Sequence, residues 1–316
     1  MSPEAEEAKS RRSLVGGTVR LPDSSTPRLL DPPFLRKLEQ ASIAAKHIHI
    51  GRTKGERRSA RRGSSVEFAD FRGYNPGDDL RYLDWNAFAR LQRLFLKLFI
   101  EEEDLHVYLL LDASRSMDFG EPSKHRWAQQ AAAALSYIAL CGGDRVQVFT
   151  HAGGDGNVSR LFRGRGCAPE VFDWLSGQAA AGETGLVQAV RWFRAIAPAP
   201  GLTFLLSDLL TPEWEEALSQ LAVGKGEACV LQVLSPEEFS PTARGDLRLI
   251  DSETEEDREV TMGASLLRRY ADERDRFLGG VRATCNRYGF SYLFSLTSQQ
   301  VEDVILKSLR RLQVIR

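Results

Sequence analysis

Residues 106–116, HVYLLLDASRS, give the clearest indication of the fold of this chain. Its first seven residues, 106–112, are a short and mostly apolar run that ends in Asp112. A run of this length and composition is typical of a strand that is buried on both faces, as in parallel sheets covered by helices. We therefore predict a buried parallel strand whose carboxyl end presents Asp112, Ser114 and Ser116.

Predicted strands and helices alternate on the carboxyl side of this stretch, from residue 105 to residue 235. A helix is predicted over 124–141, where apolar side chains recur at helical spacing. Further strands are predicted at 145–150, 159–164, 202–208 and 228–234, and further helices at 168–179, 186–197 and 213–223. This alternation indicates βαβ crossovers, and so an α/β fold with a doubly wound, mainly parallel sheet.

The pattern along the chain divides it into three regions. We predict a mobile tail over 1–30, an N-terminal extension over 31–104 and an α/β domain over 105–316. In the extension, a helix is expected from residue 33 to about 50, and FLKLFIE (95–101) is expected to pair beside 106–112. The α/β domain is predicted to carry a β-hairpin insertion at about 239–263, then helices at 264–286 and 299–314 around a strand at 290–295.

Composition and charge narrow the class of protein. The chain has 316 residues, of which 42% are apolar and 27% are charged, so a sizeable core can form and disorder of the whole chain is excluded. Because 42 Lys and Arg stand against 43 Asp and Glu, the net charge of −1 makes nucleic acid an unlikely partner. The basic segment 52–62 keeps a nucleic-acid-binding protein open as an alternative.

Features of the sequence also indicate a cytoplasmic protein. Its four cysteines are scattered without a C-x-x-C pair, which fits a reducing compartment. The longest apolar stretch, 131–141, is too short to span a bilayer, so no membrane span is predicted. The first residues are acidic where a signal peptide would need a basic and then an apolar region.

Oxygen-bearing side chains gather at the ends of the predicted strands. Asp112 and Asp208 both end buried strands, and they converge on one crevice if those strands are neighbours where the strand order reverses. Thr184 precedes a helix at the same rim, and Ser114 and Ser116 add two hydroxyls. Hard oxygen donors without Cys or His favour Mg²⁺ or Mn²⁺, and an under-neutralised ion can accept a carboxylate from another molecule. His151 is expected one strand away from this crevice.

These five residues resemble a known metal site. The pattern D-x-S-x-S, then Thr, then Asp is similar to the metal-ion-dependent adhesion site of von Willebrand factor A-type domains, and it reads here as Asp112, Ser114, Ser116, Thr184 and Asp208. The resemblance implies a von Willebrand factor A-like, Rossmann-type fold. It also implies a protein partner that supplies an acidic side chain to the metal.

A second resemblance lies upstream, in RRGSSVEFADFRGYNPGDDLRYLDWNAFARLQRLFLKLFIEEED (61–104). This segment is similar to the signature of domain of unknown function family 58. The matching residues are Gly63, Glu67, Phe68, Arg72, Tyr74, Gly77, Asp78, Asp79, Arg81, Asp84, Trp85 and Arg90. The resemblance covers about residues 50–235 and is expected to continue to the C-terminus. It implies a MoxR-type AAA+ ATPase as partner, because such proteins are often encoded beside one. The charges around Trp85 predict an internal scaffold clamped to the sheet, with a partner-facing surface as the alternative.

Together these features predict a non-enzymatic, metal-dependent protein-interaction module. It would act as an adaptor for a MoxR-type AAA+ ATPase in client remodelling or complex assembly. The alternatives are a Mg²⁺-dependent hydrolase that uses Asp112 as nucleophile and a nucleic-acid-binding protein. The hydrolase is disfavoured because Ser114 stands where such an enzyme needs a second carboxylate as general acid. The chain also lacks the G-x-x-x-x-G-K-[ST] loop of ATPases.

Overall fold

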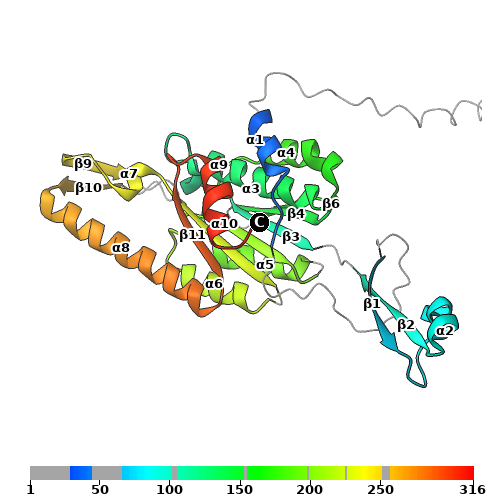
Figure 1. Cartoon of the computed structure of the whole chain (residues 1–316). Helices are drawn as coiled ribbons and strands as arrows, with labels where there is room; N and C mark the ends of the chain where they lie inside the picture. Colours follow the sequence, from blue (N-terminus) through cyan, green and yellow to red (C-terminus); the bar gives the residue numbers. More distant parts are fainter. Residues whose placement is uncertain are drawn as a thin grey trace, which may run out of the picture.

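The computed structural model of the chain describes residues 29–44, 66–101, 105–152, 155–197, 199–224, 226–250 and 257–316 (Figure 1). The predicted tail up to residue 28 and the basic segment 52–62 lie outside the described residues. Leu29 and Leu30, which the prediction placed in the tail, are buried against the core of the α/β domain.

A mainly parallel sheet forms the centre of the fold. Within the described part of the chain its strands are β3 (His106–Asp112), β4 (Arg145–Ala152), β5 (Asp155–Val158), β6 (Phe162–Arg163), β7 (Leu202–Ser207), β8 (Glu227–Leu234) and β11 (Ser291–Leu296). They lie in the order β11-β8-β7-β3-β4-β5, with β6 also paired to β4. Only β5 and β6 run antiparallel to their neighbour β4. This arrangement confirms the predicted doubly wound α/β fold.

Helices cover both faces of this sheet (Figure 1). One face packs against α1 (Pro32–Leu38), α3 (Lys124–Cys141), α4 (Ala168–Ser176) and the C-terminal helical run. The other packs against α5 (Leu186–Ile196), α6 (Trp214–Ala222) and the C-terminal part of α8 (Ala264–Arg287). Each face has its own apolar cluster, so the strands between them are buried on both sides, as their continuous apolar sequences predict.

The helix α3 lies deepest in the molecule. Its alanines at 131–134 have no exposed surface, because small side chains let the helix approach the sheet and α4 closely. Trp127 fixes the same helix to the C-terminal region by donating from Nε1 to the carbonyl of Gln299, at 2.9 Å. The N-terminus of α3, capped by Ser123, therefore has a fixed position beside the carboxyl edge of the sheet.

Several predicted elements differ from the structure. The helix predicted to reach residue 50 ends at Leu38, and the chain beyond it forms a bridge between Ile43 and Ile315. The strand predicted at 159–164 is reduced to the short β6 at 162–163, and β5 at 155–158 precedes it. The C-terminal helix is interrupted: α9 (Val301–Asp303) leads into a π-helical turn (Val304–Ser308) and then α10 (Leu309–Arg311).

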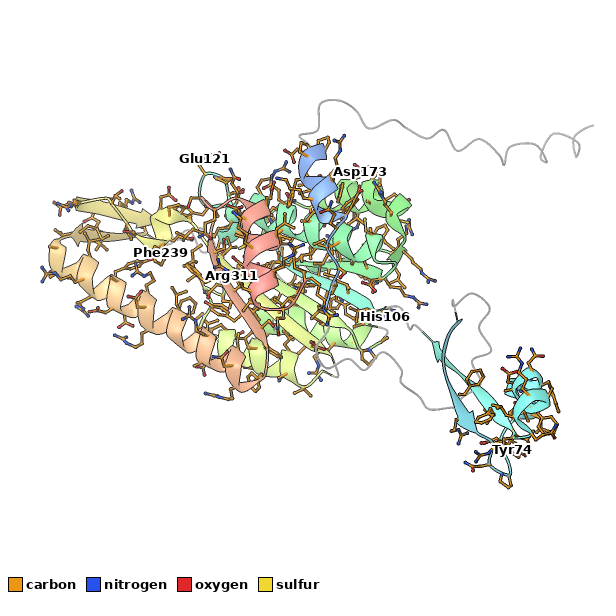
Figure 2. The ribbon with its side chains drawn as sticks, in the orientation of Figure 1. Tyr74, His106, Glu121, Asp173, Phe239 and Arg311 are labelled. Carbon is orange, nitrogen blue, oxygen red and sulfur yellow. The ribbon has the colours of Figure 1, made fainter. Side chains whose placement is uncertain are left out.

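The FLKLFIE segment was predicted wrongly as a partner of 106–112. It forms β2 (Phe95–Glu101), which pairs antiparallel with β1 (Val66–Gly73) instead of joining the central sheet. A 3₁₀ turn (Leu80–Tyr82) and α2 (Trp85–Leu91) fill the connection between the two strands. Figure 2 marks this extension by Tyr74 and the start of the central strand by His106. The pairing partner was missed because β1 carries no regular apolar alternation, and its register shifts between Phe68 and Asp70.

The predicted charge network in this extension is only partly present. Arg72 pairs with Asp78 at 2.9 Å, and Asp84 is buried and caps α2 by accepting from the amides of Asn86 and Ala87. The Trp85 side chain is 63% exposed and contacts Phe88 edge-on, so it is not the centre of an internal scaffold.

Because Asp84 is buried and Trp85 is exposed, replacing each residue by alanine should destabilise the protein to a different extent. Asp84→Ala should lower the free energy of unfolding by about 1 kcal/mol, because it removes the N-cap of α2. Trp85→Ala should change it by less than about 1 kcal/mol, because the exposed indole buries little surface. Denaturant unfolding of the full chain measures both. A larger loss in Trp85→Ala than in Asp84→Ala would show that the indole is buried in solution.

The predicted insertion is a β-hairpin of β9 (Gly245–Ile250) and β10 (Asp257–Met262). It follows α7 (Pro236–Phe239) and leads into α8, and its acidic tip at 251–256 lies outside the described residues. Tyr270 and Arg274 of α8 donate to the carbonyls of Glu238 and Phe239, which fixes α7 against α8. In the described part of the chain, no helix combines the length and the apolar character needed to cross a membrane.

Candidate metal centre

The predicted site residues lie together at the carboxyl edge of the sheet. The chain runs from β3 to β4 on one side and later returns to β7 on the other side of β3, so the strand order reverses between β3 and β7. These two strands are parallel neighbours, with Leu111 opposite Leu206. Asp112 at the end of β3 and Asp208 just after β7 therefore meet at the crevice where α/β sheets bind ligands.

Asp112 is held from two sides. Its Oδ1 accepts a hydrogen bond from the amide of Ser114 at 3.0 Å, and its Oδ2 accepts one from the hydroxyl of Ser207 at 2.6 Å. The residue is 6% exposed. The carboxylate is thus oriented by its own loop and by the last residue of the neighbouring strand β7.

The two serines link this carboxylate to Asp208. Ser114 Oγ lies 3.0 Å from Ser116 Oγ, and Ser116 Oγ lies 3.4 Å from Asp208 Oδ2. Both serines face the cluster because the chain turns into a short 3₁₀ helix (Arg115–Asp118) directly after Ser114. Asp208 Oδ1 accepts from the amide of Leu210 at 3.0 Å, which fixes the other carboxylate oxygen.

Backbone strain accompanies Asp208. The next residue, Leu209, has a φ of 59° although it is a fully buried leucine, and this region of backbone space is unfavourable for a branched side chain. The amide of Leu209 donates to Ser207 Oγ at 3.0 Å, and Gln232 donates to the carbonyl of Asp208 at 2.9 Å. These bonds keep the strained turn in place, as is common at functional sites.

Thr184 reaches the same rim on a separate loop. The amide of Ala181 donates to the carbonyl of Ala113 at 2.8 Å, and the amide of Arg115 donates to the carbonyl of Gly182 at 2.9 Å. The loop before α5 is therefore bonded to the loop that carries Ser114. Thr184 is half-buried two residues beyond Gly182. The structure thus joins Asp112, Ser114, Ser116 and Asp208 through side-chain and backbone contacts and brings the Thr184 loop against them.

A buried lysine completes the cluster, and sequence reasoning missed it. Lys124, the first residue of α3, has no exposed surface, and its Nζ lies 2.6 Å from Asp208 Oδ2 and 2.5 Å from Glu238 Oε1. Glu238 belongs to α7 and forms a capping box with Ser235. The S-P-E-E sequence at 235–238 indicates that capping box. No local signal connects Glu238 with Lys124, which lies 114 positions away.

Burial and charge shift the protonation of this cluster. Burial raises the pKa of Asp112 to about 6, helped by the negative charge of Asp208, while hydrogen bonds from Ser207 and Ser114 act in the opposite direction. Burial alone would lower the pKa of Lys124, but the charges of Asp208 and Glu238 outweigh it and raise that pKa above its usual value. The site thus combines a stable ammonium with a carboxylate whose charge is poorly compensated.

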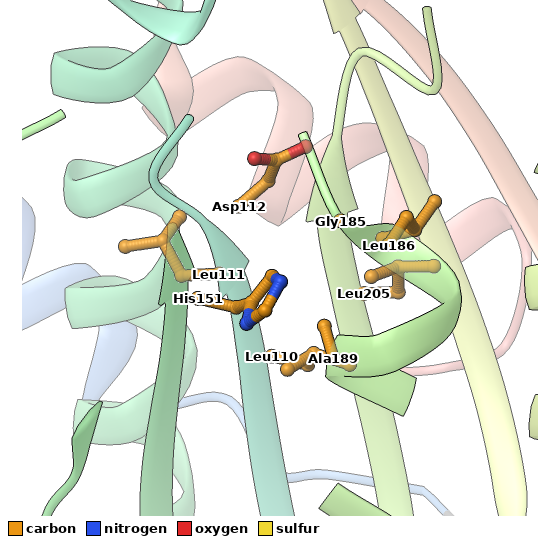
Figure 3. Close-up of a pocket in the computed structure, with 8 residues that line it drawn as sticks. All are labelled: Leu110, Leu111, Asp112, His151, Gly185, Leu186, Ala189 and Leu205. Carbon is orange, nitrogen blue, oxygen red and sulfur yellow. The ribbon is translucent and has the colours of Figure 1, made fainter. Parts of the chain in front are cut away.

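His151 lies one strand away from the crevice between β3 and β7, as predicted, and it borders Asp112. It is on β4 directly opposite Asp112, and both residues line a cavity of about 10 Å³ together with Gly185 at the start of α5 (Figure 3). A side chain at Gly185 would meet His151, because an added Cβ would lie 2.8 Å from its Nε2. The cavity, at about 10 Å³, has room for about one water molecule.

The donor set is compatible with one class of metal. Among the described residues, no group of three or more His, Cys, Asp or Glu side chains could hold a metal, so any ion here depends on hydroxyls as well as on two carboxylates. Hydroxyl and carboxylate oxygens suit a partly hydrated Mg²⁺ or Mn²⁺, whereas zinc and copper favour nitrogen and sulfur.

Comparison with known proteins identifies the family. A family model described as "Protein of unknown function DUF58" matches residues 70–276. The chain belongs to this family. It is 28% identical over 242 residues to Uncharacterized protein Rv1480 of Mycobacterium tuberculosis, a match that spans 75% of this chain and 76% of the relative. Uncharacterized protein Mb1516 of Mycobacterium bovis matches with the same identity and the same coverage.

Solved structures also resemble the chain at low sequence identity. The conserved hypothetical protein BatB from Bacteroides thetaiotaomicron gives a TM-score of 0.41 at 16% identity, covering 66% of this chain and 98% of BatB. The SpRpn10 VWA domain gives a TM-score of 0.36 at 10% identity, covering 64% of this chain and 94% of that domain. The match of the family model to residues 70–276 confirms the sequence-based assignment to the DUF58 family.

Proposed function

We propose that this DUF58 protein is a non-enzymatic, metal-dependent protein-interaction module. Mg²⁺ or Mn²⁺ would be held by Asp112, Ser114, Ser116, Thr184 and Asp208, and the ion would coordinate an Asp or Glu side chain of a partner protein. The observation that carries this proposal is the chain of contacts from Asp112 through Ser114 and Ser116 to Asp208, at the edge where the strand order reverses.

The electrostatics of the cluster support an added cation. Burial raises the pKa of Asp112, and the negative charge of Asp208 adds to this effect, so a positive counter-charge would stabilise its ionised form. A divalent ion would supply that counter-charge. Asp208 already has part of its charge balanced by Lys124, so the ion would keep net positive charge for a further carboxylate ligand. These features favour capture of an acidic side chain from outside.

The sequence at the end of β3 supports binding over catalysis. The cavity of about 10 Å³ beside Asp112 has room for about one water molecule, so a partner's carboxylate cannot enter it. In the sequence, Ser114 stands where a phosphatase of the strand-end aspartate type needs its general acid. We therefore place the ligand outside the crevice, at the rim formed by Ser116 and the Thr184 loop.

A MoxR-type AAA+ ATPase is the partner that we propose. This part of the proposal rests on the resemblance of residues 61–104 to the family signature. The adaptor would present a client to the ATPase for remodelling or assembly.

Titration calorimetry with MgCl₂ and MnCl₂ tests the metal site. Wild type is expected to bind one ion, and Asp112→Ala is expected to lose this binding. Asp118→Ala is a matched control, because Asp118 is an exposed aspartate just beyond the Ser116 loop. Equal binding by wild type and Asp112→Ala would contradict the assignment.

Co-purification with the MoxR-type ATPase of the same organism tests the interaction. We expect capture by wild type and by Asp118→Ala in Mg²⁺, and loss of capture in EDTA or in Asp112→Ala. The same samples are assayed with a generic phosphomonoester, and turnover above background is not expected. Turnover that disappears in Asp112→Ala would replace the interaction module by the hydrolase.

A further inference from the structure

The buried ammonium of Lys124 occupies one side of the proposed metal site. Its Nζ contacts Asp208 Oδ2 at 2.6 Å, the same oxygen that lies 3.4 Å from Ser116 Oγ. An ion held by Ser116 and Asp208 would therefore lie next to this ammonium. Lys124 and Asp208 are at most 1% exposed, so solvent screens their charges little.

Glu238 gives Lys124 a second partner that does not belong to the proposed ligand set. Its Oε1 accepts from Lys124 Nζ at 2.5 Å, while its Oε2 accepts from the amide of Ser235 at 2.9 Å. Hydrogen bonds from α8 to the carbonyls of Glu238 and Phe239 hold the segment that carries this carboxylate. Lys124 can therefore stay paired with Glu238 when Asp208 turns toward an ion.

We propose that Lys124 is an internal counter-ion that competes with the divalent ion for Asp208. The inference rests on the metal-binding function proposed above. Without metal, the ammonium balances Asp208 and keeps the empty site folded. With metal, the same positive charge repels the ion and lowers its affinity. Lys124 thereby weakens metal binding and allows the chain to fold without the metal.

The charges of the cluster explain both effects. Asp112, Asp208 and Glu238 are three carboxylates served by one ammonium, so a divalent ion brings the group close to neutrality. Replacing the ammonium by an apolar side chain of similar length leaves Asp208 and Glu238 close together without a cation. Such a site is unfavourable when empty and attracts a divalent ion more strongly.

The Lys124→Met variant tests this inference by two readouts, the melting temperature in EDTA or in MgCl₂ and the calorimetric Kd for Mg²⁺. We expect a melting temperature well below that of wild type in EDTA and a larger rise on adding Mg²⁺. The Kd should fall by at least about tenfold, because one repulsive charge beside the ion is gone. Lys37→Met is the control, since Lys37 forms an exposed pair with Glu302.

A second variant covers the case in which Lys124→Met does not fold without metal. Lys124→Met/Glu238→Gln removes the extra carboxylate together with the ammonium, so the empty site keeps fewer unpaired charges. It should fold in EDTA and should still bind Mg²⁺ more tightly than wild type does.

Three outcomes separate the inference from the function on which it rests. Tighter Mg²⁺ binding by both Lys124 variants than by wild type supports both. If wild type binds Mg²⁺ and the Lys124 variants bind it equally or more weakly, the counter-ion role is wrong and the metal site remains supported. Absence of Mg²⁺ binding in wild type and in all variants overturns the metal site and the inference together.

Discussion

Asp208→Ala is expected to lower the free energy of unfolding by about 3 kcal/mol in EDTA, since it removes one of the two carboxylates that pair with buried Lys124. An ammonium with no exposed surface cannot recover this loss from water. Denaturant unfolding at neutral pH measures the effect, and the absence of metal isolates the ion pair from any role of Asp208 as a ligand.

The double variant Asp208→Ala/Lys124→Met is the control for this expectation. If the loss comes from the broken Lys124–Asp208 pair, the double variant should be more stable than the sum of the two single losses predicts. Asp118→Ala, at an exposed position nearby, should stay within about 0.5 kcal/mol of wild type. Additive losses would show that Lys124 and Asp208 do not interact in solution.

The sheet could be predicted because each of its main strands can be recognised from a short local run of sequence. The runs at 106–112, 202–207 and 227–234 are mostly apolar, and each becomes an almost fully buried strand of the central sheet. The position of Asp112 and Asp208 follows from the same pattern, because parallel strands end at one edge. For this reason the convergence of the two aspartates was predicted without knowledge of their contacts.

The contacts that set the chemistry of the site depend on residues far apart in sequence. Lys124 reaches Asp208 across 84 positions, and nothing near a lysine at a helix N-terminus indicates burial. A lysine is ordinarily exposed because burying its charge is costly, and the positive end of the helix dipole also disfavours a lysine at this position. The partner of β2 was missed for the same reason. The sequence of β2 is compatible with pairing to several strands, and tertiary contacts determine that it pairs with β1.

Asp112→Asn is expected to raise the free energy of unfolding in EDTA, whereas Asp208→Ala is expected to lower it. The pKa of Asp112 is raised from 3.8 to about 6 in the folded protein, mainly by burial, so folding favours its protonated form. The stability that this preference provides is complete below about pH 4 and is lost as the pH rises through about 6. A shift of about two pKa units corresponds to about 3 kcal/mol, so in EDTA at pH 7 the neutral asparagine should make the protein more stable by up to that amount.

Unfolding curves from pH 4 to pH 8 in EDTA, for wild type and Asp112→Asn, measure this difference. The two proteins should have similar stability near pH 4, and the variant should become the more stable one as the pH rises. Adding Mg²⁺ at pH 7 should then stabilise wild type and leave Asp112→Asn unchanged, because the ion replaces the proton as the partner of the carboxylate. Parallel profiles of stability against pH for the two proteins would mean that the ionised form of Asp112 does not destabilise the folded protein. A gain in stability from Mg²⁺ in Asp112→Asn equal to that of wild type would mean that the ion binds elsewhere.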